Sequence, residues 1–356
     1  MIDQRLRGLN FGGWFSQIDA VIEKDPETFP GIDKHIESFL LNKDIVRVKN
    51  AGFNHIRLPI DYQIFFSEQG TLVYENRFEL LKQAVGQATR AGLMVILDLH
   101  ECPGHDFHEG VKEAQSFFSH QEKREASKKV WLNLCRAFGE NPLVLLEILN
   151  EPVAPSARVW NEVKQEMADF IRQNAPQSTI VVGSNLWNMP STFSELTPLP
   201  DPNALYSFHF YVPLLFTHQR APWIDDPNIL VSREYPGEYQ LGDLKDRRLE
   251  SEIGYWDKAR LLQSIEPVIR FRDKYKVAVA CNEFGVFHQA PRESQLRWLN
   301  DFLSILKEHE IAYSYWNYKN LDFGVISFGE QLHQDLAQFK NSDRLDKEVL
   351  EVLKSY

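Results

Sequence analysis

Two glutamates, each placed shortly after an apolar run, are the residues of this chain best suited to carry out chemistry. Glu151 lies in the segment Leu149–Pro152, after the run 143–146, and Glu283 lies in Cys281–Gly285, after the run 277–280 and 132 positions further along. Such runs predict buried strands, so both carboxyl groups are expected at strand ends. Two carboxyl groups presented in this way suit hydrolysis of a glycosidic bond: one donates a proton to the leaving oxygen, and the other attacks or assists as a carboxylate.

These two roles need opposite environments. To act as an acid near neutral pH, Glu151 needs a raised pKa, which an apolar wall or a second carboxylate can provide. Glu283 must stay ionised, and Arg57 and Tyr211 are the candidates to hold it in that state. Asn150, directly before Glu151, suits a hydrogen bond to the 2-hydroxyl of a sugar, a bond that strengthens in the transition state.

The elements that would position these residues alternate along the chain. Helical patterns that close at Gly52 and Gly92 are each followed by an apolar run, as expected for helix, turn and strand. Strands are predicted near 6–10, 54–58, 93–99, 143–149, 179–184, 205–210, 276–283 and 311–316, and helices include 121–139, 156–174, 256–274 and 293–309. This alternation predicts one (β/α)₈ barrel of the α/β class over residues 1–356 rather than an open sheet.

In such a barrel the active site forms at the carboxyl ends of the strands. Polar and aromatic residues recur at the predicted exits: Asn10, Trp14, Arg57, His100, Asn150, Glu151, Asn185, Trp187, His209, Tyr211, Glu283 and Trp316. Trp316 offers a flat apolar face to a sugar ring, and Trp14, Trp187 and Trp223 extend that platform. All of these except Asn10 and Trp223 form the predicted site: Glu151 and Glu283 catalytic, the others binding substrate.

One connection is too long for a plain loop. The segment after the sixth strand predicts an inserted cap or small subdomain over residues 214–254 at the rim of the site.

Bulk properties narrow the partners. Lys and Arg total 39 against 50 Asp and Glu, so the net charge of −11 opposes binding to nucleic acid or to an anionic membrane and suits a neutral substrate. Cys102, Cys135 and Cys281 are too few and too widely spaced for a disulfide framework, which predicts reduced core thiols. The chain has no apolar signal core and no membrane-length apolar run. We expect a monomer without cofactor, either cytoplasmic or secreted with its signal removed.

The segment His100–Glu109 is an alternative source of chemistry. Its His, Asp and Glu side chains are metal ligands by type, but their spacing matches no standard motif and Pro103-Gly104 predicts a turn. The preferred interpretation places His100 in the cleft and His105 and His108 on the following loop, with no metal site.

Taken together, the exit residues resemble glycoside hydrolase family 5, the cellulase-type retaining barrel enzymes. The resemblance runs from about residue 8 to 323 and depends on Arg57, His100, Asn150-Glu151-Pro152, His209-Phe210-Tyr211, Glu283-Phe284-Gly285 and Trp316. It implies that Glu151 is the general acid/base and Glu283 the nucleophile. The subsite where the bond is cut would be lined by Arg57, His100, Asn150, His209, Tyr211 and Trp316.

Finer features resemble a compact bacterial endoglucanase group that carries a subdomain after the sixth strand. They are Gly8–Trp14, Phe216–Gln219, Tyr235–Tyr239 and Trp316–Lys319. This likeness implies an endo-acting hydrolase of β-1,4 and mixed β-1,3-1,4 glucans, with a β-glucan as partner. Three alternatives stay open: an exo-β-1,3-glucanase or β-mannanase of the same fold, a non-catalytic carbohydrate-binding barrel, and a metal-dependent hydrolase using the His100–Glu109 loop.

Overall fold

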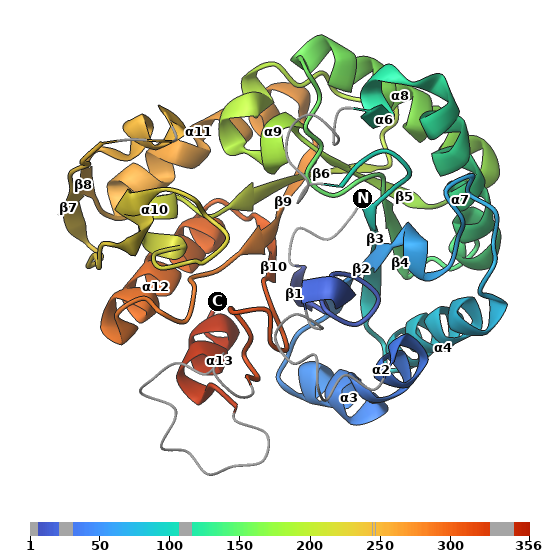
Figure 1. Ribbon diagram of the computed structural model, residues 1–356, viewed down its shortest axis with the longest axis horizontal. Helices are drawn as coiled ribbons and strands as arrows, with labels where there is room; N and C mark the ends of the chain where they lie inside the picture. Colours follow the sequence, from blue (N-terminus) through green and yellow to red (C-terminus); the bar gives the residue numbers. More distant parts are fainter. Residues whose placement is uncertain (1–5, 21–30, 107–115, 244, 246, 328–344) are drawn as a thin grey trace.

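A closed barrel of eight parallel strands forms the centre of the molecule (Figure 1). The computed structural model describes residues 6–20, 31–106, 116–243, 245, 247–327 and 345–356. Around the barrel the strands follow the order β1-β10-β9-β6-β5-β4-β3-β2. Their bounds are β1 Arg7–Asn10, β2 His55–Asp61, β3 Met94–Glu101, β4 Val144–Glu147, β5 Thr179–Gly183, β6 Ala204–Phe210, β9 Ala278–Phe284 and β10 Ala312–Tyr315. Each predicted strand overlaps one of these, and the predicted fold class is confirmed.

Helices surround the barrel and cover its outer face (Figure 1). They are α2 Ile32–Ser38, α3 Asn42–Asn50, α4 Glu75–Arg90, α6 Ser116–Ser119, α7 Gln121–Phe138, α8 Ala157–Asn174, α9 Asn185–Asn188, α11 Lys258–Tyr275, α12 Arg292–Glu308 and α13 Lys347–Lys354. Because both faces of the strands are covered, β2 and β6 are buried along their whole length, and polar residues within them need partners inside the protein. The three cysteines are unpaired and buried, as predicted. Within the described ranges, no helix combines the length and apolarity needed to cross a membrane.

The interior of the barrel changes from apolar to polar along the strands. Near their amino ends an apolar cluster fills the barrel: Leu6, Ile96, Leu145, Val181, Leu205, Ala280 and Ala312. Side chains alternate along a strand, so the residue two positions further on shares its face. On five of these strands that next inward residue is polar and fully buried: Asp98, Glu147, Ser207, Asn282 and Ser314. The apolar layer therefore closes the barrel from below, and a polar layer forms the floor of its mouth.

The first and last barrel strands close the sheet at the mouth. β1 pairs with β2 on one side and with β10 on the other. The side-chain amide of Asn10, the last residue of β1, donates to the carbonyl oxygens of Asn282, Ser314 and Tyr315 at 2.8, 3.3 and 3.3 Å. One buried amide thus joins the chain's first strand to β9 and β10.

The long connection after β6 contains short elements of its own. It consists of α10 Leu214–Thr217, the 3₁₀ turns Pro227–Leu230 and Arg247–Glu252, and an antiparallel pair of strands, β7 Gly237–Tyr239 and β8 Gly254–Trp256. We refer to residues 214–256 as the insert. It lies beside the barrel, with β7 and β8 on its outer edge (Figure 1).

Candidate active site

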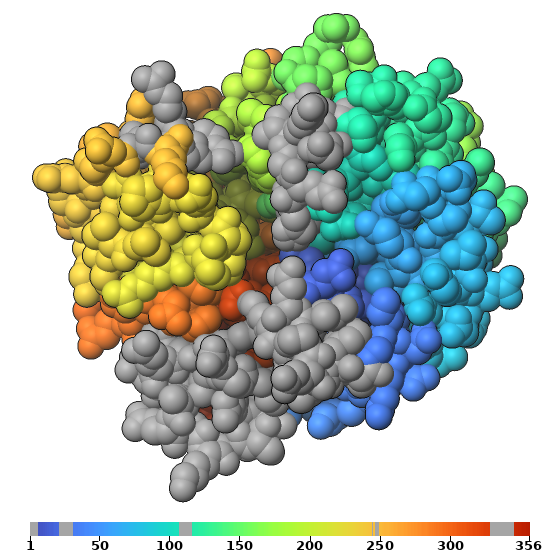
Figure 2. Space-filling view, viewed as in Figure 1, coloured from blue at the N-terminus to red at the C-terminus, as the bar shows by residue number. Residues whose placement is uncertain are grey.

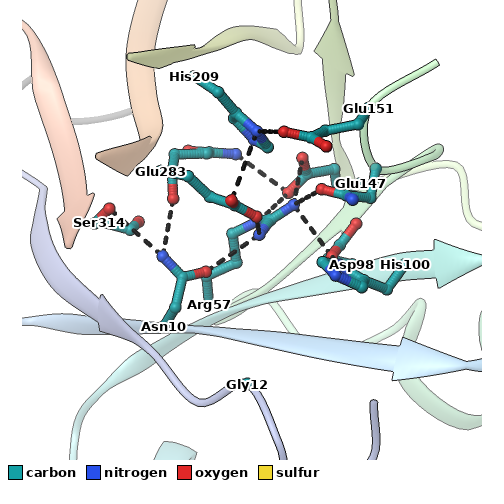
Figure 3. A network of polar contacts seen from close by, with 12 residues as sticks. Asn10, Gly12, Arg57, Asp98, His100, Glu147, Glu151, His209, Glu283 and Ser314 are labelled. Atoms are coloured by element: carbon teal, nitrogen blue, oxygen red, sulfur yellow. Dashed lines mark hydrogen bonds and ion pairs between the residues drawn. The ribbon is translucent and has the colours of Figure 1, made fainter. Parts of the chain in front are cut away.

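The two glutamates of the sequence prediction meet at the barrel mouth, on either side of His209 (Figure 3). Glu283 belongs to β9, and Glu151 lies four residues beyond the end of β4. One oxygen of each carboxyl group and one ring nitrogen of His209 lie within 4.8 Å of one another. Nδ1 of His209 is 2.7 Å from Oε1 of Glu151 and 3.5 Å from Oε2 of Glu283.

Glu151 sits in an unusual backbone conformation. Its φ of 43° lies in the left-handed region, which costs a non-glycine residue about 1–2 kcal/mol. Pro152 contributes, since a residue before proline is sterically disfavoured in the right-handed helical region. The neighbouring backbone fixes the turn: Asn150 N–H donates to the Leu99 carbonyl and Trp187 N–H donates to the Pro152 carbonyl. The chain thereby turns away from β4 with the Glu151 side chain directed at His209.

The two carboxyl groups differ in the charges that lie near them. Burial raises the pKa of Glu151 well above its ordinary value, and the negative charge of Glu283 raises it further. Burial also raises the pKa of Glu283, to about 7, but the positive charge of Arg57 and the hydrogen bond from Tyr211 oppose that rise. Glu283 is therefore the carboxyl group that ionises first, and Glu151 is the one that keeps its proton.

Arg57, in β2, is the fixed cation of the site, with no exposed surface. Its Nη1 donates to Glu283 Oε1 at 2.6 Å, and its Nε and Nη2 form a fork on Glu147 at 2.7 and 3.1 Å. Nη2 also lies 3.0 Å from Oδ2 of Asp98. Burial disfavours the charge of Arg57, yet Asp98, Glu147 and Glu283 together raise its pKa well above the ordinary value. This guanidinium orients the Glu283 carboxylate and stays charged while doing so.

Three residues that build this floor were not predicted from the sequence: Asp98, Glu147 and Asn282. Glu147 accepts from Arg57 and from the Asn282 side-chain amide at 3.0 Å, and Asp98 lies 2.7 Å from Nδ1 of His100. A signal was available, because Asp98 and Glu147 are ionisable residues inside otherwise apolar runs. A buried charge of that kind needs a partner of opposite sign, and Arg57 provides it.

In the described part of the site, the positive charge of Arg57 is thus shared among four carboxyl groups. Burial raises the pKa of Asp98 to about 7 and raises that of Glu147, with Arg57 opposing both shifts. Because a single guanidinium cannot neutralise Asp98, Glu147, Glu151 and Glu283 together, the cluster retains protons near neutral pH.

His209 and Tyr211 complete the surroundings of the acids as neutral groups. Burial lowers the pKa of His209 well below its ordinary value, with Arg57 adding to the effect. A neutral imidazole can serve Glu151 in either state: its Nδ1–H donates to the carboxylate, or Nδ1 accepts from the protonated acid. Burial and the charge of Glu283 raise the pKa of Tyr211, so its hydroxyl keeps the proton that it donates to Glu283 Oε2 at 3.0 Å.

Trp316 and His100 form a stacked pair beside the acids. Their rings are nearly parallel, at 2°, with centroids 5.8 Å apart. Gly12 packs against the indole, since a Cβ on this glycine would lie 2.6 Å from Cη2 of Trp316. The peptide bond after Trp316 is cis. Both residues were predicted at strand exits, and the structure stacks their rings; their contact with substrate stays a prediction.

Two predicted substrate contacts are corrected by the structure. Trp14 packs against Phe15 and donates its indole N–H to the Ile36 carbonyl, so its ring is used within the core beside α2 rather than in a sugar platform. The Asn185 amide is used within the protein, accepting from Ala154 N–H and donating to the Ala154 carbonyl. It fixes the turn after Glu151. Trp187, partly exposed beside Pro152, remains a predicted substrate contact.

A metal ion has one candidate position in the described part of the chain, between Glu151, His209 and Glu283. The Arg57 guanidinium, 2.6 Å from Glu283, already supplies positive charge there, which makes a second cation unfavourable. The loop considered as an alternative metal site continues into residues 107–115, outside the described residues. Its described members His100, His105 and Asp106 are not part of any metal-type cluster found in the described ranges.

Comparison with known proteins gives the same result. The sequence matches the profile of cellulase (glycosyl hydrolase family 5) over residues 22–322. The chain belongs to this family. It is therefore a glycoside hydrolase, and the resemblance deduced from the exit residues is confirmed.

Relatives in family 5 cover nearly the whole chain. Endoglucanase C of Acetivibrio thermocellus is 30% identical over 338 residues, covering 90% of this chain and 93% of its own. Cellodextrinase A of Ruminococcus flavefaciens is 30% identical over 310 residues, covering 86% and 83%. Among solved family 5 structures, endoglucanase Cel5A of Thermotoga maritima superimposes with a TM-score of 0.74 at 20% identity, covering 99% and 97% of the two chains. That likeness confirms the barrel.

Proposed function

We propose that this family 5 enzyme is a retaining, endo-acting β-glucanase that hydrolyses β-1,4 and mixed β-1,3-1,4 glucosidic bonds, working as a monomer. The observation that carries the proposal is the short distance between the acids, since oxygens of Glu151 and Glu283 lie within 4.8 Å. Retaining enzymes hold their carboxyl groups about 5–5.5 Å apart, whereas inverting enzymes need about 6.5–9.5 Å to admit a water molecule.

In the first step Glu283 attacks the anomeric carbon while the glycosidic C–O bond breaks and Glu151 gives its proton to the leaving oxygen. Arg57 and Tyr211 hold the attacking carboxylate, and burial keeps Glu151 protonated for this step. In the second step Glu151 takes a proton from water, the water oxygen attacks the same carbon, and the ester bond to Glu283 breaks. Neutral His209 can stay hydrogen-bonded to Glu151 in both protonation states of the acid.

Asn150 is positioned to keep a hydrogen bond to the sugar during the reaction. Its Oδ1 accepts from Arg57 at 2.9 Å, which turns its amide nitrogen outward from that pair, and this nitrogen has no hydrogen-bond partner in the described structure. An amide N–H held in this way can donate to the 2-hydroxyl, where the bond strengthens as positive charge develops on the ring. Trp316 and His100 supply the apolar side of the same subsite.

The roles of the two acids are tested by azide rescue of alanine variants. Glu283→Ala with azide is expected to give a glycosyl azide of inverted configuration, because azide then replaces the nucleophile. Glu151→Ala with azide is expected to give the retained configuration, because Glu283 still forms the ester. The opposite pairing, or a first product of inverted configuration from the wild-type enzyme, contradicts the retaining mechanism.

The substrate is tested by reducing-sugar release from lichenan, carboxymethyl cellulose, laminarin and mannan, with Glu151→Gln as the inactive control. Relatives named endoglucanases and a cellodextrinase support the first two polymers. Greater activity on laminarin or mannan would favour the exo-β-1,3-glucanase or β-mannanase alternatives. Wild-type activity no higher than that of Glu151→Gln would favour a binding protein, and activity abolished by chelation would favour a metal mechanism.

A further inference from the structure

A line of aromatic rings leads from Glu283 along the insert to Trp223. The hydroxyl of Tyr211 donates to Glu283, and the Tyr211 ring meets His218 edge to face at 5.0 Å between centroids. His218 in turn meets Trp223 edge to face at 6.1 Å. Each ring in this line contacts the next, so Trp223 is structurally continuous with the nucleophile.

Trp223 is held at its edge yet open to solvent. It also meets Phe287 edge to face, at 5.3 Å and 74°. Phe287 belongs to a small buried cluster with Trp316 and Phe323, to which Ala221, two residues before Trp223, also contributes. Even so, Trp223 is 52% exposed. A large apolar side chain fixed at its edge by buried neighbours and left half open is suited to contact a ligand.

The segment that carries Trp223, called the wall below, is held both within the insert and to residues outside it. Both oxygens of the buried Glu252 carboxylate accept from the N–H groups that begin α10, those of Leu214 and Leu215, at 2.6 and 2.8 Å. Thr217, at the end of α10, donates to the Tyr211 carbonyl at 2.7 Å and accepts from Phe287 N–H at 2.7 Å. Because the wall is fixed before any ligand arrives, little ordering cost is added on binding.

The ring between Tyr211 and Trp223, that of His218, is uncharged. Burial lowers the pKa of His218 to about 3, so this imidazole is neutral in any ordinary buffer. On the view onto the barrel mouth, the insert, in yellow, borders the hollow at the centre of the face (Figure 2). The uncharged aromatic rings of His218 and Trp223 match the C–H face of a pyranose ring better than a charged ligand.

We propose that Trp223 forms a sugar-binding subsite for a further glucosyl unit of the same chain, beyond the unit that is bonded to Glu283. This inference rests on the proposed function and assigns a role to the insert: it selects for longer chains. The exposed Tyr255 provides a matched control, because it is an aromatic residue of the same insert and is 56% exposed. It belongs to β8, which lies on the outer edge of the insert (Figure 1).

The test compares kcat/KM on cellotriose and cellohexaose for the wild type, Trp223→Ala, Trp223→Leu, Trp223→Phe and Tyr255→Ala. We expect the ratio of cellohexaose to cellotriose values to fall about tenfold in Trp223→Ala, equivalent to ~1.4 kcal/mol, from loss of apolar contact area. Trp223→Leu keeps apolar bulk without a flat face and should resemble Trp223→Ala. Trp223→Phe should retain most of the ratio, and Tyr255→Ala all of it.

Three results would overturn the subsite: an unchanged ratio in Trp223→Ala, equal losses on both substrates, or the same fall in Tyr255→Ala. Failure of the proposed function is distinguishable, because the wild type would then release no sugar from either oligosaccharide. In that case binding of cellohexaose, followed by tryptophan fluorescence and calorimetry, decides the subsite. Weaker binding by Trp223→Leu than by Tyr255→Ala would support it, and equal or undetectable binding by both would reject it.

Discussion

The floor of the site and the wall beside it are built in opposite ways. The floor comes from inward side chains of β2, β3, β4 and β9, where Arg57, Asp98 and Glu147 have no exposed surface. The wall comes from the insert, whose elements are short and whose apolar residues Trp223, Leu230 and Tyr255 are more than half exposed. Charge control needs a low-dielectric surrounding with fixed partners, whereas contact with a polymer needs an open surface. The catalytic chemistry therefore depends on the buried barrel strands, whereas contact with a long glucan chain is assigned to the exposed insert.

The largest effect is expected when the cation is removed from the floor. Arg57→Met leaves the buried carboxyl groups of Asp98, Glu147 and Glu283 without their common partner. We expect a loss of roughly 3–5 kcal/mol in the free energy of unfolding and of at least about 10³-fold in kcat. Urea denaturation and steady-state kinetics measure both.

The control for that change is Arg260→Met in the region of the wall. Arg260 lies over the Trp256 ring at 4.0 Å and donates to the Ser251 and Tyr255 carbonyls. We expect a loss of about 1 kcal/mol or less and an unchanged kcat. Equal effects of the two substitutions would show that floor and wall do not differ in the way described.

The second prediction concerns the pH dependence of stability. The pKa of Glu283 is raised to about 7 in the folded protein, so the folded state holds a proton that the unfolded chain releases near pH 4.5. The corresponding stability is fully present below about pH 4 and is lost as the pH rises through about 7. Wild-type free energy of unfolding should therefore decline from pH 4 to pH 8, by roughly 1–3 kcal/mol from this group.

Measuring that decline in Glu283→Gln isolates the contribution, because glutamine does not titrate. The slope between pH 4 and 8 should become shallower, and the variant should be more stable than the wild type at pH 8. Glu238→Gln, at an exposed position of β7, should leave the slope unchanged. A wild-type slope retained in Glu283→Gln would contradict the assignment.

The third prediction concerns the pH dependence of activity. The charge of Asp98 raises the pKa of Glu283, and Asp98 also lies 3.0 Å from the guanidinium that Glu283 shares. Asp98→Asn removes this charge and leaves Arg57 more available to Glu283. The acidic limb of the kcat/KM profile should move to lower pH by about one unit. A limb that stays in place or moves upward would show that Asp98 does not influence the nucleophile.

The smallest effect is expected from a single methyl group. Gly12→Ala places a Cβ 2.6 Å from the Trp316 ring, so the indole must shift away from its stacking partner His100. A several-fold fall in kcat/KM is expected, since a slight misplacement beside the reacting centre is costly. Gly242→Ala, in the insert, meets nothing closer than the Asn228 Oδ1 at 3.8 Å and should be silent. A silent Gly12→Ala would contradict the packing described for Trp316.

Sequence reasoning reached the fold and the acids because both leave local signals. Apolar runs marked the strands, and polar residues near the carboxyl ends of those runs marked the mouth, where Glu283 contacts both Arg57 and His209. The floor was missed because Asp98 and Glu147 lie within the runs. Whether such a residue faces inward depends on the register between strands, which a single chain does not reveal.

The prediction that Trp14 contacts substrate was wrong for a related reason. As an aromatic residue just beyond β1, it had the same local appearance as Trp316. What separates the two is the path of the chain after them, since α2 returns over Trp14 and accepts its indole N–H at Ile36. No spacing within the sequence predicts that contact, because it depends on where α2 packs against the barrel.

The hydrogen bonds by which Asn10 joins β1 to β9 and β10 have a consequence for biosynthesis. Its amide donates to carbonyl groups of β9 and β10, which lie 272 to 305 residues further along the chain, so β1 leaves the ribosome long before these two strands exist. Until then the nascent sheet has an unpaired edge, and the carboxylate of β9 has not yet been translated. Catalytic competence should therefore arise in a single late event, when the final strand emerges and pairs with the first.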